Sequence, residues 1–600
     1  MPRIDYSLLK IMMQRRFKNM GFVKKENMGL DTETYKGYVK LICDSDGRYS
    51  FIDCFEDVIE FLLHKKFRGK FNWFYNINFD FQSVVKYLPI EDLTYLYVNK
   101  NLNIGEGRHI QYLDKKFFAI NDGSKNYYYF YDLYNFLDTS LEKASKKFLR
   151  DGKLKIIDAG KLNTDIDYWS KHSDDIIRYC IQDAKLTQRL ADHFWNIIYR
   201  NLNYYPKRPF SKGKLSEEYF LSKCYIPTIN EIDREVIEYA YKSYYGGRFE
   251  LLQKGFFEQV YSYDIKSAYP AQIVELIDFS RGEWKKTFIL NPDCEYGFYL
   301  CEVDCLEAYF SPFRQQIGLL NIYPNGRFRQ YLCRQEIDFM LDNFEHVRIK
   351  VLSGYEFFAE DYYYPFKAEI NKLYDWKERE NDPDIKYCVK IILNSLYGKT
   401  IQVVGDENKT GKLFNPMYAS LITAGTRIKL LEYALQKPDC VISFSTDSIS
   451  TTEKIQVPKK PKLGDFAFDF EGSGVFVMSD IYNLWNNKTK ENKNRLRGFA
   501  FKKEKDYDDK TILLKDILRS MPFSSKYSYI TSRPYHLGEC LLHTKKKDVS
   551  MINVFYDVEK TIDINGDKKR IWLSQFENGN DALKRVIKSL PIVMEGGKKK

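Results

Sequence analysis

The sequence lacks the cysteine pattern of disulfide scaffolds and zinc modules. Its 600 residues include 11 cysteines, but no two of them form a Cys-x-x-Cys pair. Cys301 and Cys305 are the closest pair, and no histidine clusters near them. We therefore expect no zinc site and a set of reduced thiols, as in an intracellular protein.

Long apolar runs, internal repeats and low-complexity tracts are also missing. No stretch approaches the roughly 18 apolar residues that a membrane span needs. The basic N-terminal stretch, residues 1–25, lacks the apolar core of a signal peptide. We interpret it as an arm that contacts DNA. A mitochondrial presequence is the alternative, against which Asp5 and the lack of serine enrichment argue.

Acidic residues are fewer than basic ones, 82 Asp and Glu against 93 Lys and Arg, which gives a net charge of +11. This balance favours a polyanionic partner, but a solvated basic surface explains it equally well. The 48 Tyr and 43 Phe could stack on bases. An AT-rich genome would raise these counts together with Lys, Asn and Ile, so composition carries little functional weight.

Acidic residues in the first part of the chain stand where strands end. In GLDTETY, Asp31 and Glu33 are two residues apart, so in a strand both carboxylates point to one face. Such a pair is also common on solvated strands. The segment FNWFYNINFDFQSVV reads as a strand that runs through Asn76, Phe79 and Asp80 into a helix, which delivers a third carboxylate.

A helical segment, SDDIIRYCIQDAKLTQRLADHF, completes this first set. Tyr179 and Asp183 are four residues apart and share one face of the helix. Four carboxylates suit two-metal hydrolysis of a phosphodiester, and Tyr179 could orient the attacking water. Oxygen ligands favour Mg²⁺, with Mn²⁺ as the alternative, over zinc.

These three segments, in this order and spacing, resemble the three exonuclease motifs of proofreading DNA polymerases. The resemblance implies a 3′→5′ exonuclease in which Asp31, Glu33, Asp80 and Asp183 bind metal. Between the motifs, Ser140 and Leu141 are similar to the family's contact to single-stranded primer. Lys153 fits the family's conserved lysine better than Lys155 does, and ordinary surface charge is the alternative for both.

The segment VYSYDIKSAYPAQI reads as a strand that ends in a tight turn, with Asp264 at the strand end. Backbone amides of such a turn can cradle phosphates. The segment resembles the first palm motif of family B DNA polymerases, with Ala268 in place of leucine. The resemblance implies that Asp264 binds the catalytic metals and that Tyr269 excludes a 2′-hydroxyl from beneath the sugar.

The segment DIKYCVKIILNSLYGKT is expected to form one helix with Lys390, Asn394 and Tyr397 in a single stripe. Such a stripe is usually amphipathic surface, but its spacing matches the family's second motif, whose lysine binds the incoming triphosphate. Upstream, Lys377 or Arg379 is expected to be a second triphosphate contact.

The segment CVISFSTDSIST reads as strand, turn and strand with Asp447 at the tip. It resembles the family's metal-binding hairpin, except that Ser445 replaces the first aspartate. Asp447 stands at the metal-ligand position. Just upstream, Thr423 and Arg427 resemble a template-binding motif.

YKSYYGGRFE resembles the motif that coordinates the exonuclease and polymerase ends of DNA, through Tyr244, Gly246 and Gly247. Together with the short chain and the long Asp264–Lys390 interval, it is typical of protein-primed polymerases of the phi-29-like and linear-plasmid type. Tyr482 aligns with the tyrosine of a DNA-binding Lys-x-Tyr motif, in which Asp480 replaces the lysine.

We therefore expect an α/β and α+β multidomain protein, with an RNase H-like exonuclease domain followed by a right-hand polymerase of palm, fingers and thumb. The expected divisions are 1–205, arm and exonuclease; 206–279, linker and first palm part; 280–365, an insertion like the terminal-protein-binding region; 366–400, fingers; 401–416, a shortened second insertion; 417–525, second palm part; and 526–600, thumb and a basic, disordered tail.

The expected partners are primer-template DNA, dNTPs and a terminal protein that acts as primer. We expect a soluble monomer in the host cytoplasm, with the mitochondrion as the alternative. The shortened second insertion predicts an open ring and a weaker grip on DNA. Two rival functions remain. One is an exonuclease whose polymerase half is degenerate, and Ser445 and Asp480 are the evidence for it. The other is a non-catalytic DNA-binding protein.

Overall fold

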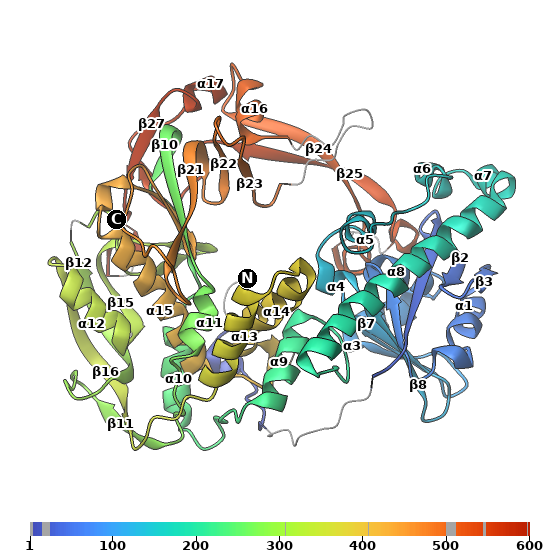
Figure 1. Cartoon of the computed structure of the whole chain (residues 1–600), viewed down its shortest axis with the longest axis horizontal. Coiled ribbons are helices and arrows are strands. Elements are labelled where there is room, and N and C mark those ends of the chain that lie inside the picture. Colours follow the sequence, from blue (N-terminus) through green and yellow to red (C-terminus); the bar gives the residue numbers. More distant parts are fainter. Residues whose placement is uncertain are drawn as a thin grey trace.

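The structure is a computed structural model that describes residues 4–14, 24–306, 308–405, 407–499, 512–543, 548–596 and 598–599. Figure 1 shows an N-terminal domain on one side and a larger lobe on the other, joined by helices below and by a long hairpin above. In the described part of the chain, no helix has the length and apolar character needed to cross a membrane.

The N-terminal domain is built on a mixed sheet with strand order β3-β2-β1-β4-β8-β7-β6-β5. β1 runs parallel to β4 and β4 parallel to β8, whereas the outer strands are antiparallel. The strands are β1 (Asn27–Tyr35), β2 (Tyr38–Asp44), β3 (Tyr49–Phe51), β4 (Phe71–Phe74), β5 (Asn101–Asn103), β6 (His109–Leu113), β7 (Phe117–Asn121) and β8 (Tyr127–Asp132).

Helix α8 (Ser173–Leu202) packs on this sheet beside β1, because its Ile176, Leu186 and Leu190 face inward and are buried. The approach is close: a side chain at Gly29 of β1 would meet the backbone of Ala184. The other helices are α1 (Phe55–Leu62), α2 (Ile77–Val85), α3 (Ile90–Asn99), α4 (Tyr134–Leu137), α5 (Leu141–Leu149), α6 (Ala159–Leu162) and α7 (Ile166–Lys171).

The larger lobe contains a central antiparallel sheet with order β23-β22-β21-β10-β20-β19-β9. Its strands come from two stretches of the chain that the insertion and several helices separate. They are β9 (Arg248–Leu251), β10 (Gln253–Ile265), β19 (Val441–Thr446), β20 (Ser448–Thr451), β21 (Phe466–Met478), β22 (Ile481–Trp485) and β23 (Asn492–Leu496).

Between these two stretches, residues 282–359 form most of an insertion sheet of order β11-β16-β12-β15-β28-β29. Its strands are β11 (Gly282–Thr287), β12 (Tyr296–Cys305), β15 (Asn325–Cys333) and β16 (Val347–Ala359), with α12 (Arg334–Asn343) against them and a small hairpin, β13 (Gln315–Ile317) and β14 (Leu320–Ile322).

The C-terminal residues differ from the sequence expectation of thumb and disordered tail. Only β24 (Lys526–Pro534) and β25 (Phe555–Asp563) form a projecting hairpin. The chain then returns: β26 (Ile571–Trp572) and β27 (Val586–Leu590) extend the central sheet, whereas β28 (Val593–Glu595) and β29 (Lys598–Lys599) join the insertion sheet. The expectation of a disordered tail is therefore wrong for Lys598 and Lys599, which pair with β28.

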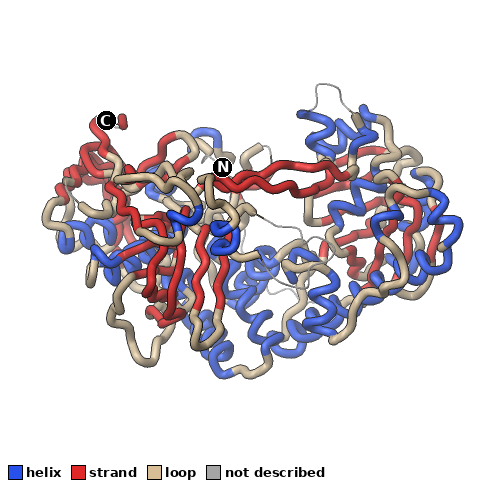
Figure 2. The backbone as a smooth tube through the Cα atoms, turned by 90° about the horizontal axis from the view of Figure 1, so that it is seen from above, coloured by secondary structure: helices blue, strands red, loops and turns tan. Residues whose placement is uncertain are grey.

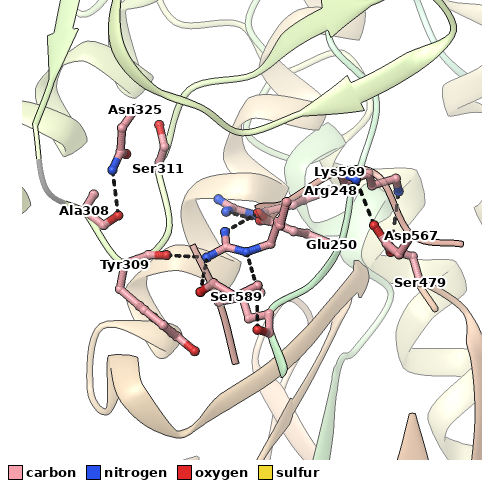
Figure 3. A network of polar contacts seen from close by, with 12 residues as sticks. Arg248, Glu250, Ala308, Tyr309, Ser311, Asn325, Ser479, Asp567, Lys569 and Ser589 are labelled. Atoms are coloured by element: carbon pink, nitrogen blue, oxygen red, sulfur yellow. Dashed lines mark hydrogen bonds and ion pairs between the residues drawn. The ribbon is translucent and has the colours of Figure 1, made fainter. Parts of the chain in front are cut away.

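A buried ion cluster fixes this return (Figure 3). The Glu250 carboxylate of β9 accepts from Arg248 and, at 2.7 Å, from Arg570. Arg570 also donates to the carbonyl of Tyr309 and to the hydroxyl of Ser589, at 2.7 Å each. One guanidinium thus ties the C-terminal segment to the central sheet and to the insertion.

Helices connect the two lobes. α9 (Lys212–Lys223), α10 (Arg234–Ser243), α11 (Ala268–Ile273), α13 (Lys367–Arg379), α14 (Pro383–Ser395) and α15 (Pro416–Ala434) share one apolar core with α8 and with one face of the N-terminal sheet. The predicted single helix from residue 384 onward ends earlier than expected, at Ser395, and Tyr397 lies in a following 3-10 turn (Tyr397–Lys399).

The expected second insertion is a short hairpin, β17 (Val403–Val404) and β18 (Lys409–Thr410). The N-terminal stretch packs on it, because Lys10 pairs with Lys409 and the backbone of Met12 donates to Thr410. The described residues 4–14 thus contact protein rather than projecting as an arm for DNA. Arg15, Arg16 and Lys18 of the expected arm lie outside the described residues.

Candidate active sites

The first acidic cluster lies where β1 meets α8. Asp31 and Glu33 on β1 and Cys180 on α8 each offer a ligand atom within 4.8 Å of the others. Asp80, near the start of α2, accepts from the Thr32 hydroxyl at 2.6 Å, so it reaches the same end of β1. The sheet and two helices therefore bring the predicted carboxylates together, as the motif spacing predicts.

Asp183 completes the cluster from α8. One of its oxygens pairs with the Lys153 ammonium at 2.5 Å, and the other is buried without a hydrogen-bond partner among the described residues. A buried, unpartnered carboxylate oxygen is costly unless something satisfies it, and a cation would do so. The oxygen donors here fit magnesium or manganese.

Burial and mutual repulsion make this cluster electrostatically strained. Burial, followed by the repulsion of Asp183, raises the pKa of Glu33 to about 8. Burial also raises the pKa of Asp80 to about 7 and that of Asp183 to about 6. Asp31 has its pKa raised by burial and by its three acidic neighbours. Bound cations would reverse these shifts, so the site is arranged to hold positive charge.

Lys153, rather than Lys155, is the lysine that reaches the cluster. Its ammonium lies 4.7 Å from the centroid of the Tyr179 ring as well as against Asp183. Burial lowers the pKa of Lys153, but the acids around it, Asp183 and Asp31 first, outweigh that effect and raise it. Lys153 therefore stays charged and holds Tyr179 and Asp183 in place.

The expected primer contacts lie around this cluster. Asn76 is exposed in a left-handed conformation, with φ 69°, just before α2. The Phe79 ring lies 6.4 Å from that of Phe555, on the long hairpin. Ser140 caps α5 by accepting from the Lys143 amide, and Leu141 is buried in the core. Helix capping and core packing account for these two residues without DNA.

The second acidic cluster lies at one end of the central sheet. Asp264 pairs with Ser448 across β10 and β20, and the Ile265 amide donates to the Asp447 carbonyl at 2.8 Å. The turn that carries Asp447 is tight, since its amide donates to Ser445 O at 2.7 Å. Thr446 beside it has φ 59°, an uncommon conformation for a β-branched residue and one that marks functional turns.

Gly247 explains part of this geometry, because a side chain there would come within 2.7 Å of the Thr446 methyl group. At Gly246 nothing lies within 4 Å, so packing does not require glycine there. Tyr244 donates or accepts at 2.6 Å with the Tyr397 hydroxyl. The expected Tyr-x-Gly-Gly segment therefore packs against the turn that carries Asp447.

A third acid, which no sequence motif marks, lies beside Asp264. Burial, then the charges of Asp469 and Asp447, raise the pKa of Asp264 to about 6. Burial also raises the pKa of Asp447. Asp469 lies at a bulge of β21 and pairs with Lys493 at 2.8 Å. Only the strand register reveals this acid, because no family pattern in the sequence points to it.

A cavity of about 720 Å³ opens beside Asp264 and Asp447. Four lysines line it, together with Tyr269 and Asn394: Lys147, Lys377, Lys386 and Lys390. Lys377 also donates to Ser267 at 3.0 Å. The sequence left Lys377 and Arg379 as alternatives; Arg379 is exposed and does not line the cavity.

The Tyr269 ring forms one wall of this cavity and stacks on Tyr397, with ring centroids 4.3 Å apart. Tyr397 itself does not line the cavity, so it supports Tyr269 from behind. Tyr482 of β22 lies near the site. Burial raises the pKa of its hydroxyl, and the opposing effect of Arg495 is smaller, so the pKa is raised overall.

Two expected DNA contacts are placed elsewhere. Arg427 is 4% exposed, pairs with Glu336 at 2.6 Å and donates to the carbonyls of Tyr245 and Gly246. Thr423 is buried and bonds within its own helix. The prediction of direct template contact is therefore not supported for either residue. Arg427 instead positions the Tyr244–Gly247 segment, a role that its partner 91 residues away conceals from the sequence.

Ser445 and Asp480, the two departures from the family pattern, contact each other. The Ser445 hydroxyl donates to Asp480 at 2.7 Å. Asp480 is 3% exposed and pairs with Arg497 at 2.8 Å, with Arg495 at 3.9 Å. Asp480 is therefore a neutralised counter-ion inside the protein and presents no free negative charge to DNA.

Comparison with known proteins finds similarity to DNA polymerases over part of the chain. Residues 150–410 match the family described as DNA polymerase type B, organellar and viral. The chain is also 28% identical over 275 residues to the DNA polymerase of Acidianus bottle-shaped virus (isolate Italy/Pozzuoli), which is 43% of this chain and 40% of that protein. The match thus spans less than half the length of this relative.

Among solved structures, the chain has the fold of Phi29 DNA polymerase. The form complexed with single-stranded DNA superposes with a TM-score of 0.63 at 17% identity, over 90% of this chain and all of the other. The form complexed with primer-template DNA and incoming nucleotides gives 0.60 at 16% identity with the same coverage. The expectation of a mixed α/β multidomain fold of this type is confirmed.

Proposed function

We propose that this chain is a template-directed DNA polymerase with a proofreading 3′→5′ exonuclease, each activity at its own carboxylate cluster. The observation that carries the proposal is the joining of Asp264 and Asp447 at the mouth of the lysine-lined cavity. Carboxylates facing a polycationic cavity fit a nucleoside triphosphate bound through metal. When bound, Mg²⁺ would neutralise the charge that develops on the phosphoryl oxygens and activate the attacking hydroxyl or water.

In this proposal the chain's own residues bind and orient the substrates. Lys377 and Lys390 hold the triphosphate as point charges, and Asn394 lies one helical turn from Lys390. Tyr269, held flat by Tyr397, closes the space where a 2′-hydroxyl would stand. Lys386 and Lys147 add charge that the motifs did not predict, and Lys147 comes from the N-terminal domain.

At the first cluster, Asp31, Glu33, Asp80 and Asp183 would hold the metal ions. Tyr179 lies next to Asp183 and Lys153, so its hydroxyl can orient a water toward a scissile phosphate. The shared core of the two lobes would keep this site at a fixed distance from the polymerase site.

Priming by a terminal protein is the most specific part of the proposal. Its support is the insertion between the two stretches of the central sheet, in which the separate β13–β14 hairpin exposes Leu319 to 79%. Exposed apolar side chains at a hairpin tip suit a protein contact. Incubation with the candidate terminal protein, Mg²⁺ and each labelled dNTP in turn tests it, and no label transfer with any of the four would exclude this mode of priming.

Primer extension tests the central proposal. The chain should extend an annealed primer with dNTPs and Mg²⁺ and should shorten a single strand from its 3′ end. The double variant Asp31→Ala/Glu33→Ala should stop shortening while sparing extension, because the clusters are separate. A chain that shortens DNA but never extends it would support the rival function, an exonuclease with a degenerate polymerase half, for which Ser445 speaks.

A further inference from the structure

The long hairpin β24–β25 is anchored at both ends. It leaves the central sheet, spans the molecule and ends on the N-terminal domain (Figures 1 and 2). The described residues of its tip, 535–543 and 548–553, form a latch that buries Leu537, Cys540, Leu541 and Ile552 in the apolar core of the N-terminal domain. None of these four is more than 2% exposed.

Buried polar contacts fix the latch to α2. The Lys86 ammonium, on a residue that is 2% exposed, donates to the carbonyls of Ser550, Ile552 and Lys36, each at 2.7 Å. Three acceptors use all of its protons, and two belong to the latch. Asn553 donates to Phe79 O and to the Ser83 hydroxyl, both at 2.7 Å. Breaking such contacts leaves buried groups unsatisfied, so the docked position is strongly favoured.

Further contacts surround these. The His536 ring lies 3.1 Å from the side chains of both Asn78 and Gln82, and the Leu537 amide donates to Gln82 at 3.0 Å. Gly37 touches the latch so closely that a side chain there would come within 2.5 Å of Ile552 O. The interface is therefore packed and specific rather than a grazing contact.

The two lobes are also joined on the opposite side. His193 of α8 lies 2.8 Å from Asp384 of α14, and the Tyr387 hydroxyl donates to Phe136 O at 2.6 Å. α14 in turn contacts α11, α11 packs on α15, and α15 packs on β19 and β20 of the central sheet. The hairpin packs on β21 and β22 of that sheet through Ile562, and its tip contacts the N-terminal domain. This sequence of contacts is a closed ring.

The span between the two anchors has two chemically different faces. The β24–β25 register places Tyr527, Tyr529, Arg533, Tyr556 and Lys560 on one face, on which neither strand carries an acid. Arg533 of this face pairs with Glu539 of the latch at 2.6 Å. The other face carries Asp557, Glu559 and Asp563. On the first face, Lys560 donates to Gly498 O at 3.0 Å and Tyr529 contacts Phe499. The two contacted residues, Gly498 and Phe499, directly follow Arg497 in the chain. Arg497 pairs with Asp480 beside the polymerase site.

We propose that the latched hairpin closes a ring around the primer-template duplex, with the acid-free face toward the DNA. The inference rests on the proposed polymerase function. The duplex is the occupant that fits, because it leaves the site of Asp264 and Asp447 next to this face, and aromatic and basic side chains without acids suit a sugar-phosphate backbone. In this proposal the latch supplies the closure that the short β17–β18 hairpin does not, in contrast to the open ring expected from the sequence.

Product length from single binding events tests the ring. A primed single-stranded circle is bound by the full chain, and dNTPs, Mg²⁺ and an excess of heparin as trap are added together. The latch variant Lys86→Met/Asn553→Asp should give products at least about tenfold shorter than the parent, since four interdomain hydrogen bonds are lost. Its rate of first nucleotide addition should match that of the parent.

Lys254→Met is the matched control. Lys254 is 1% exposed and donates to Asn565 at 2.9 Å, near the base of the hairpin, so the variant loses an equally buried ammonium without touching the latch. Its products should keep the parental length. His536→Ala is a milder change on the latch, and its products should be intermediate in length between those of the parent and the double variant. It replaces the double variant in the test if the double variant does not fold.

Equal product lengths for parent and latch variants would overturn the ring, whereas a parent that adds no nucleotide would overturn the proposed polymerase instead. A second readout needs no synthesis: release of labelled protein into heparin from a covalently closed circle and from the same duplex made linear. The parent should leave the circle more slowly than the linear duplex, and the latch variant should leave both equally fast. Equal release of the parent from both would also overturn the ring.

Discussion

The first carboxylate cluster should make the metal-free protein lose stability as pH rises. Folding raises the pKa of Glu33 to about 8 and that of Asp80 to about 7. The folded state therefore binds more protons than the unfolded state between about pH 4 and pH 8, so the free energy of unfolding falls as pH rises through this window. Each shift is roughly 3 pKa units, or about 4 kcal/mol, and the two are coupled and add only in part.

The assay is thermal unfolding in chelator and in excess Mg²⁺ at several pH values. A loss of about 4 kcal/mol corresponds to a fall in Tm of roughly 10 °C for a domain of this size. In chelator, Tm should fall by about this much from pH 5.5 to pH 8.5, and Mg²⁺ should restore most of it at the higher pH.

The double variant Glu33→Gln/Asp80→Asn is the control, because it removes the two titrating groups and keeps their shape. Its Tm should change much less with pH and respond less to Mg²⁺. If parent and variant lost Tm in parallel from pH 5.5 to pH 8.5, the acids would not be the cause and the description of this cluster as a metal site would be refuted.

Three further variants test individual residues. Asp447→Asn should lower primer extension by about 10³-fold or more, because it removes a metal-bridging charge, while Ser445→Ala should cost far less; equal losses would show that the site is wrongly described. Tyr269→Val should raise ribonucleotide incorporation, measured as the ratio of kcat/KM for rNTP and dNTP, and an unchanged ratio would exclude the gate. Lys153→Ala should slow single-strand shortening about 10–100-fold by releasing Asp183 and Tyr179, with extension intact; parental shortening would exclude that role.

Local patterns in the sequence place the carboxylates on the right kinds of element. Asp31 and Glu33 lie on one strand and Asp183 lies on a helix, as their spacing predicts, while their role as metal ligands is a prediction from the family resemblance. The same holds for Asp264 at a strand end and Asp447 at a turn. Each depends on contacts between neighbouring elements whose type the sequence patterns predict.

Contacts between distant residues escape such patterns. Arg427 carries the residue type of a template contact, but its charge is used by Glu336, which no motif marks. The latch joins Lys86 to residues more than 460 positions away. Asp469 reaches Asp264 only because β21 bulges beside β10. In each case the function of a side chain depends on a partner that only the folded chain brings near.

Asp480→Lys distinguishes two explanations of the altered Lys-x-Tyr motif. If Asp480 only weakens DNA binding, then the family's lysine should improve it. The structure predicts the opposite, because the side chain at position 480 is buried between Arg497, at 2.8 Å, and Arg495. A lysine there would place three cations together and leave the Ser445 hydroxyl without its acceptor. Asp480 also has φ 61°, which aspartate tolerates better than lysine.

We expect Asp480→Lys to lower Tm and primer extension together. Asp480→Asn should keep the fold while it frees Arg495 and Arg497 from their ion pairs, which should steepen the salt dependence of DNA binding. Tighter DNA binding and faster extension by Asp480→Lys at unchanged Tm would show that Asp480 has no structural role and only removes the DNA contact of the family's lysine.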